Sequence, residues 1–135
     1  MKTATFLLLS LALVQPAWSA APRELAEGYS AEAARNAPGF KPSPRRGAEF
    51  YARRFAVSEK MPACTACHTD SPAQTGQHAV TGKAIKPLAP RAEAARFTDP
   101  AKAEKWFRRN CTEVLGRECS AAEKADFIAF LTEAP

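Results

Sequence analysis

The 135-residue sequence contains few methionines, few histidines and one long apolar run. The run extends from Phe6 to Val14, and no comparable run follows, so we expect no membrane-spanning helix in the rest of the chain. Internal repeats are absent, which excludes a solenoid. The net charge of +5 is modest and gives no indication of nucleic-acid binding. What remains is the composition of one small globular domain.

The N-terminus has the features of an export signal. Lys2 precedes the apolar run, and Ala17-Trp18-Ser19 is a small-x-small cleavage sequence. We expect cleavage after Ser19, which removes residues 1–19 as a signal peptide and leaves residues 20–135 as a single domain. The expected location is the bacterial periplasm, an oxidising compartment in which disulfides form.

Two of the four cysteines belong to the motif Cys64-Thr65-Ala66-Cys67-His68. This C-x-x-C-H spacing is typical of the attachment of one covalent haem c, in which both thiols bond the macrocycle and His68 is the proximal iron ligand. A thioredoxin-like redox pair would need a nearby β-α-β pattern, which the sequence does not show. A zinc site would need a second ligand pair at finger-like spacing, whereas the other two cysteines are eight residues apart.

The scarcity of methionine bears on the second axial ligand of the iron. Electron-transfer cytochromes c usually place a methionine opposite the histidine. Met1 leaves with the signal, and Met61 lies three residues before Cys64 on the proximal tether, so neither is suitable. Asn110 is the unexpected polar residue on an apolar helical stripe. It is either a core asparagine bonded to backbone, which periodicity alone favours, or an iron ligand through its carboxamide oxygen.

Periodicity and capping residues predict an all-α domain of about four helices. A leading helix is expected at residues 24–34, and a second from Pro44, after the N-cap Ser43, to about Val57. Gly47 within that second helix indicates the close approach of another element. Residues 62–90 are rich in Pro, Gly, Thr and Ser and show no convincing strand, so we expect a loop that wraps the haem.

Two further helices are predicted in the C-terminal part of the chain. One runs from about Asp99 to Gly116, and the other begins at the capping box Ser120–Glu123. The residues expected in the core from these helices are Ala103, Trp106, Phe107, Cys111, Val114, Phe127, Ile128 and Leu131.

Several segments outside the haem motif carry a more specific pattern: Thr81–Pro90, Arg96–Asp99, Glu104–Cys111 and Gly116–Cys119. Together with C-x-x-C-H they resemble the sphaeroides haem protein family, which are high-spin, monohaem class I-like cytochromes c. The resemblance implies a small class I cytochrome c-like fold wrapped round one haem. It implies His68 as proximal ligand, Asn110 as distal ligand and a disulfide between Cys111 and Cys119. One departure is a longer loop at 77–80, which carries His78.

A carboxamide oxygen is a weak ligand that favours ferric iron. With the Asn110 ligand that the resemblance implies, we expect electron transfer by a high-spin haem whose Asn110 ligand is displaced on reduction, so that O2, NO or CO can bind. Two alternatives stay open. One is a low-spin electron shuttle with His78 or a lysine as sixth ligand, and the other is an oxygenase or reductase at the open haem. No acid–base constellation is visible, so no catalytic residue is assigned.

The resemblance also suggests the partners. The redox partner is expected to be a dihaem c-type or membrane b-type cytochrome, and the protein itself a monomer. Basic residues form either a docking face for an acidic redox partner or an ordinary solvated surface. They are Arg45, Arg46, Arg53, Arg54, Lys83, Lys86, Arg108 and Arg109.

Overall fold

A computed structural model describes residues 20–134. The predicted signal peptide lies outside these described residues. Five helices dominate: α1 (Ala20–Asn36), α2 (Pro44–Ala52), α3 (Thr65–His68), α4 (Pro100–Leu115) and α5 (Ala121–Glu133). Two short strands, β1 (Gly76–Gln77) and β2 (Ala84–Ile85), form an antiparallel pair. The all-α prediction is thus confirmed. No helix among the described residues is both long and apolar enough to cross a membrane.

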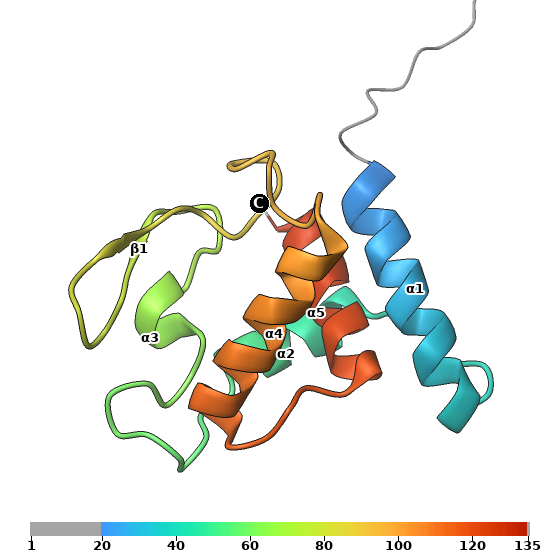
Figure 1. Cartoon of the computed structure of the whole chain (residues 1–135), viewed down its shortest axis with the longest axis horizontal. Helices are drawn as coiled ribbons and strands as arrows, with labels where there is room; N and C mark the ends of the chain where they lie inside the picture. The colour runs from blue at the N-terminus through green and yellow to red at the C-terminus, as the bar shows by residue number, and fades with distance from the viewer. Residues whose placement is uncertain (1–19, 135) are drawn as a thin grey trace, which may run out of the picture.

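The core lies among α1, α2, α4 and α5, with α5 in contact with both α1 and α2 (Figure 1). Ile128 and Leu131 on α5 are completely buried. Phe107 of α4 joins the layers, because its ring lies 5.8 Å from the Tyr29 ring of α1 and 5.8 Å from the Phe127 ring of α5, both edge to face. α3 and the strand pair lie on the side of α4 opposite α1 (Figure 1).

The second helix is shorter than predicted. Ser43 caps it by accepting a hydrogen bond from the Arg46 amide, as expected, but α2 ends at Ala52 rather than near Val57. The chain becomes extended at Arg53, and the Phe55 amide then bonds the Pro62 carbonyl at 2.7 Å, which closes a loop. The predicted helix was too long because apolar residues at helical spacing, such as Phe55, continue beyond the real end of α2 into this loop.

Gly47 has the role that the sequence indicated. A Cβ on this residue would overlap the backbone of Asp126 and lie 2.7 Å from Cβ of Phe130. Only glycine therefore lets α2 approach α5 so closely.

Both ends of α4 and the start of α5 are those the sequence predicted. Asp99 accepts a hydrogen bond from the Lys102 amide at 3.0 Å at the start of α4, which ends at Leu115, before Gly116. Ser120 and Glu123 form the reciprocal capping box of α5. Residues 62–90 are mostly irregular, but the expectation of no strand was wrong, because Gly76 pairs with Ile85 and Gln77 with Ala84.

Two polar networks fix the helices against one another. Asp126, which is buried, accepts bonds from the Arg46 guanidinium at 2.7 and 2.8 Å and from the Ser43 amide. Lys124 donates to Glu104 at 2.8 Å, and the Tyr29 hydroxyl donates to the same carboxylate at 2.8 Å. Burial alone would raise the pKa of Glu104, but these two donors hold it below its ordinary value.

Candidate functional site

The C-x-x-C-H motif forms a single helical turn. Cys64 stands at the N-cap of α3, and its carbonyl accepts hydrogen bonds from the Cys67 amide at 3.2 Å and the His68 amide at 3.0 Å. Residues three and four apart lie on the same face of a helix. The turn therefore presents both thiols and the imidazole on one side, which is the arrangement that bonding one planar macrocycle and its iron requires.

Tyr51 holds the end of this turn. Its ring is buried, and its hydroxyl lies 2.6 Å from the Thr69 carbonyl oxygen and 3.0 Å from that of His68. Thr69 leaves the helix with a φ of 62°, a left-handed conformation that is unusual for a β-branched residue. Tyr51 thus connects α2, and through it the helical core, to the backbone of the histidine.

The strand pair presses on the turn from another side. A Cβ added to Gly76 would overlap the Cys67 carbonyl oxygen and lie 3.0 Å from Cα of His68. Three residues further on, the Ala79 amide donates to the Cys67 sulfur at 3.2 Å. The backbone of this hairpin therefore packs directly against the Cys67–His68 peptide, with no side chain between them.

The electrostatics of the turn favour a metal-binding imidazole. Burial, the Arg96 cation and His78 together lower the pKa of His68 to about 4, so the ring is neutral at physiological pH and keeps a lone pair for a metal. Burial raises the pKa of the Cys64 thiol to about 11, the opposite of a redox-active C-x-x-C cysteine. No cluster of three metal-ligating side chains occurs among the described residues. The donor set fits a haem c rather than zinc or a dithiol couple.

Asn110 lies on α4, in a different part of the fold from the turn. Its side chain is exposed, so the interpretation as a core asparagine is wrong. Within the part of the chain that the structure describes, its carboxamide takes part in no hydrogen bond. An exposed amide on a helix surface is free to meet a ligand or a metal, which is the role that the family resemblance implies.

Trp106, one turn before Asn110, is also on this exposed side of α4. Its side chain is 42 % exposed and does not pack in the core as predicted, whereas Phe107 does. The Arg109 guanidinium lies 5.6 Å from the Trp106 ring centroid, in cation–π geometry. The sequence stripe was drawn too broadly, because the buried face of α4 is Ala103, Phe107, Cys111, Val114 and Leu115.

The next residue after Asn110 is covalently tied to the loop beyond α4. The structure pairs the buried Cys111 and Cys119, with their Cα atoms 5.6 Å apart. This pairing agrees with the one that the resemblance implied. It ties α4, at the residue next to Asn110, to the segment between α4 and α5.

His78 lies at the tip side of the hairpin and is half-buried. Its Nδ1 accepts hydrogen bonds from the amides of Val80 at 3.2 Å and Thr81 at 3.3 Å. A neutral imidazole that accepts at Nδ1 carries its hydrogen on Nε2. Neither nitrogen then has a free lone pair for iron.

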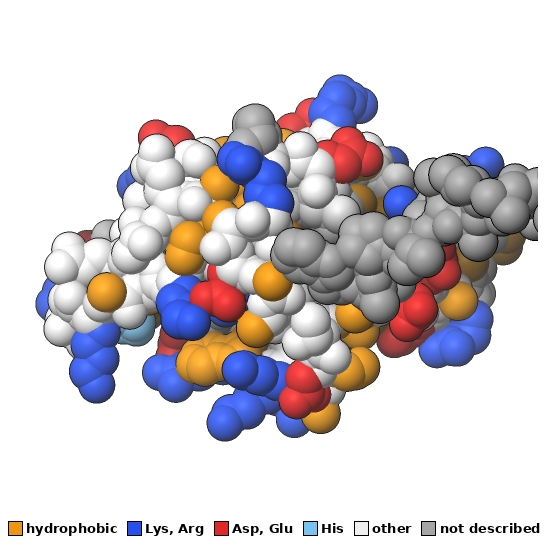
Figure 2. Space-filling model, turned by 90° about the horizontal axis from the view of Figure 1, so that it is seen from above, with side chains coloured by type: hydrophobic (Ala, Val, Ile, Leu, Met, Phe, Trp, Pro, Cys, Tyr) orange, Lys and Arg blue, Asp and Glu red, His pale blue; other side chains and the backbone are white. Residues whose placement is uncertain are grey.

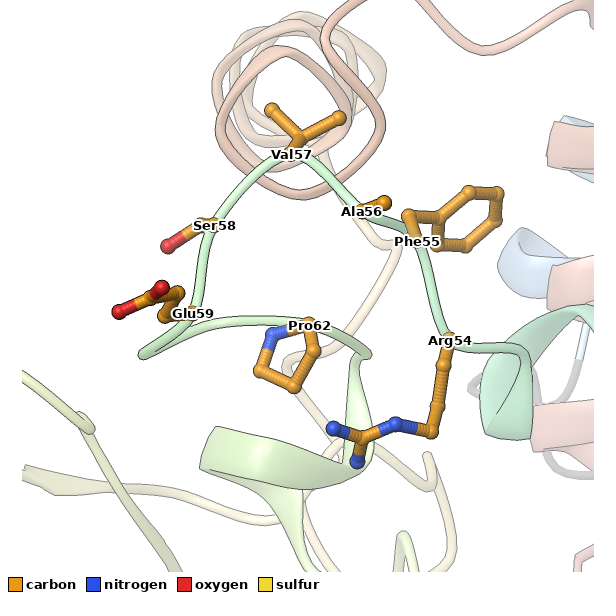
Figure 3. A pocket seen from close by; sticks show the side chains of 7 residues that line it. All are labelled: Arg54, Phe55, Ala56, Val57, Ser58, Glu59 and Pro62. Carbon is orange, nitrogen blue, oxygen red and sulfur yellow. The ribbon is translucent and has the colours of Figure 1, made fainter.

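The loop closed by Phe55 and Pro62 surrounds an open hollow of about 640 Å³. Phe55 and Glu59 point to opposite sides of it (Figure 3). None of the residues predicted to hold haem lines this hollow, so it is separate from the candidate site.

Basic side chains lie beside hydrophobic ones along one edge of the molecule seen from above (Figure 2).

Comparison with known proteins supports the interpretation of the turn. Residues 38–131 match a family model described as a domain of unknown function, DUF1924. Cytochrome c'' of Methylophilus methylotrophus is 50 % identical over 91 residues, which cover 67 % of this chain but only 63 % of that protein. Cytochrome c-type protein SHP of Cereibacter sphaeroides is 44 % identical over 128 residues, covering 93 % of this chain and 95 % of SHP.

Solved structures of the same two proteins share the fold. Oxidised cytochrome c'' superposes with a TM-score of 0.80 at 40 % identity, covering 87 % of this chain and 97 % of that one. Oxidised SHP, described as an oxygen-binding cytochrome c, gives 0.74 at 41 % identity, covering 82 % and 94 %. A solution structure of cytochrome c'', described as giving insight into haem-ligand detachment, gives 0.74 at 42 % identity and covers 83 % and 92 %.

Proposed function

Because the chain belongs to the DUF1924 family and to the family of SHP and cytochrome c'', we propose that it is an exported, monohaem c-type cytochrome with a displaceable distal ligand. Cys64 and Cys67 hold the haem through thioethers, and His68 is the proximal ligand. The observation that carries the proposal is the α3 turn, which places the two sulfurs and a neutral imidazole on one face. The proposed location is the periplasm.

Haem bound in this way supplies a one-electron iron couple and a coordination position for small ligands. His68 would supply an imidazole nitrogen to the iron, and Tyr51 and Gly76 keep its backbone in place. Asn110 would supply a second ligand to the iron through its carboxamide oxygen. The exposed, unpaired state of this amide supports the assignment, since no internal hydrogen bond has to break before it binds.

We propose that Asn110 rotates away when an electron is gained, because an amide oxygen binds ferrous iron weakly. The distal position then accepts a diatomic ligand, O2, NO or CO. The description of SHP as an oxygen-binding cytochrome and the report of haem-ligand detachment in cytochrome c'' support this behaviour. The electron donor that the proposal requires is another cytochrome, of the dihaem c-type or membrane b-type class.

The hydrogen bonds of His78 favour this proposal over a low-spin shuttle. With Nδ1 occupied by two backbone amides, His78 would have to give up these hydrogen bonds before a ring nitrogen could bind iron. An enzyme with a dedicated acid–base site has no support among the described residues of the site. We therefore propose electron transfer coupled to ligand binding as the function.

Visible spectroscopy of the purified holoprotein tests the proposal. We expect a high-spin ferric spectrum and rapid CO binding after reduction by dithionite. Asn110→Ala should keep haem attached but change the ferric spectrum. Asn36→Ala, at the end of α1, is the control and should leave the ferric spectrum unchanged. His78→Ala should leave both states as in the wild type. A low-spin spectrum in both oxidation states, no CO binding, or an unchanged spectrum in Asn110→Ala would contradict the assignment.

A further inference from the structure

Thr69 has a backbone conformation that side-chain-bearing residues rarely adopt. It directly follows His68 and has a φ of 62° and a ψ of 178°. This combination is almost confined to glycine, and any other residue held in it costs free energy that the surrounding structure must offset. Thr69 is also β-branched, the class for which a positive φ is least favourable. The backbone is therefore strained at the residue where the chain leaves the α3 turn.

The side chain of Thr69 explains why threonine rather than glycine can stand here. Its hydroxyl donates to the Ser71 carbonyl at 2.9 Å and accepts from the Ser71 amide at 3.2 Å. The Thr69 amide donates to the Thr65 carbonyl at 3.1 Å. Glycine would adopt the same φ without strain but would lose both hydroxyl bonds. Threonine thus fixes the direction in which the chain leaves the turn, although its backbone is strained.

Tyr51 holds the same peptide from the helical core. Its hydroxyl oxygen lies 2.6 Å from the Thr69 carbonyl oxygen and 3.0 Å from that of His68, so two successive carbonyls converge on one hydroxyl. A phenol has a single hydrogen to donate, and a donor placed between two carbonyl oxygens offsets the repulsion between them. The Tyr51 ring is buried, with its centroid 6.2 Å from the Phe127 ring and 5.5 Å from the Phe130 ring of α5. The hydroxyl therefore reaches the turn from a packed support.

We propose that Tyr51 and Thr69 form a clamp that fixes the orientation of the His68 imidazole, with the strained Thr69 backbone held by the Tyr51 hydroxyl. This inference rests on the proposed haem attachment at the α3 turn. Without the hydroxyl, Thr69 would relax towards an ordinary φ. Rotation about that bond would turn the peptide between His68 and Thr69, and the imidazole with it. Tyr51 is then a positioning residue, because it acts on the proposed iron ligand only through backbone.

Guanidinium unfolding of the holoprotein tests the strain. Thr69→Gly and Thr69→Ala lose the same hydroxyl, but only glycine tolerates this backbone conformation. The unfolding equilibrium constant of Thr69→Gly should therefore be about tenfold lower than that of Thr69→Ala. Thr112 is the matched control, since its hydroxyl also donates to a carbonyl, that of Arg108 at 2.7 Å, but it lies within helix α4. There the order should be reversed, with the alanine variant more stable by a factor of about five.

The proton NMR spectrum of the reduced holoprotein with CO tests the positioning. The haem ring current makes the chemical shifts of the His68 ring protons depend on how the imidazole is oriented. Tyr51→Phe should shift these resonances. Adding Thr69→Gly to Tyr51→Phe should restore most of the wild-type shift, because glycine keeps the conformation without the clamp. Tyr29→Phe is the control: it also removes a buried hydroxyl, which donates to Glu104 at 2.8 Å, and should leave the His68 resonances unchanged.

Three results would overturn the proposal. They are a Thr69→Ala variant at least as stable as Thr69→Gly, unchanged His68 resonances in Tyr51→Phe, and a shift that Thr69→Gly does not reverse. A measurement on the wild type covers variants that do not fold: the Overhauser effect between the amide and α protons of Thr69 should be strong, as it is at positive φ, and a weak effect would exclude the strained conformation.

These tests are separable from the test of the proposed function. The stability order of the Thr69 variants and the Thr69 Overhauser effect do not depend on which ligand the iron binds. If CO does not bind, a low-spin reduced protein is also diamagnetic, and the His68 resonances are compared without CO. The clamp can therefore fail while the proposed function stands, and it can be confirmed in a protein that does not bind CO.

Discussion

Substituting Gly76 by alanine should disturb the α3 turn more than any conservative change elsewhere in the hairpin. The added Cβ would overlap the Cys67 carbonyl oxygen and stand 3.0 Å from Cα of His68 and 3.1 Å from C of Cys67. Carbon atoms in good contact are about 3.5–4.0 Å apart, so backbone must move by about 0.5–1 Å. Because all the atoms met are backbone, no side-chain rotation relieves the overlap.

Overpacking of this kind typically costs about 1–3 kcal/mol. We expect Gly76→Ala to lower the free energy of unfolding by about 2 kcal/mol, measured on the holoprotein by guanidinium denaturation. The absorption spectrum should change as well, because the displaced peptide carries the proximal ligand. Gly28→Ala is the matched control. A Cβ there meets nothing within 4 Å, and alanine in a helix is favoured over glycine by up to about 1 kcal/mol.

The two variants separate local crowding from a general effect of adding a methyl group. If Gly76→Ala is as stable as the wild type and has the same spectrum, the hairpin does not press on the turn. The argument that this hairpin positions the proximal histidine would then fail.

Four further predictions concern the surroundings of the site. Glu104→Gln should lower the free energy of unfolding, measured with guanidinium, by about 2 kcal/mol, because it leaves the nearly buried Lys124 without a counter-charge. The partial exposure of Glu104 reduces this cost. Lys124→Met should lower the stability less. The folded state lowers the pKa of Glu104, so the ion pair contributes its full stability above the ordinary carboxyl pKa near 4.3 and loses it as the pH falls below that value. The difference in unfolding free energy between the wild type and Glu104→Gln should therefore shrink below about pH 4.3. Tyr51→Phe should cost about 1 kcal/mol, seen in the same assay, and make the turn backbone exchange amide hydrogen faster. Replacing Cys111 and Cys119 by serine should lower stability by about 2.5 kcal/mol from loop entropy and broaden the ferric spectrum, whereas unchanged unfolding would show that the bridge adds nothing.

Helix positions followed from the sequence where local chemistry decides them. Asp99 and Ser120 cap their helices through side-chain bonds to the next turn, so both starts were predictable. The end of α2 was not, because it depends on a bond between Phe55 and Pro62 that closes only in the folded loop. Two-residue strands carry too little periodicity to be detected from sequence.

The site also has a part that the local sequence predicts and a part that depends on the folded chain. The α3 turn is contiguous in the chain, and C-x-x-C-H specifies its chemistry directly. The supports of the turn come from distant residues whose sequence context is ordinary. Tyr51 is one of several aromatic residues in its part of the chain, and Gly76 is one more glycine in a loop. Whether Trp106 and Asn110 face the core also depends on which side of α4 its neighbours cover, and helical spacing alone leaves that choice open.

The helical core is assembled almost entirely from the two ends of the described chain. α1 and α2 come from residues 20–52, α4 and α5 from residues 100–133, while the C-x-x-C-H turn and the hairpin lie in the segment between them. The middle segment adds few buried side chains to this core, chiefly Leu88 and Ala89, so a change of its length away from these two residues should leave the helix contacts intact. The same modularity makes the protein a scaffold for grafting other cofactor-binding loops, with α2 and α4 as the fixed points of attachment.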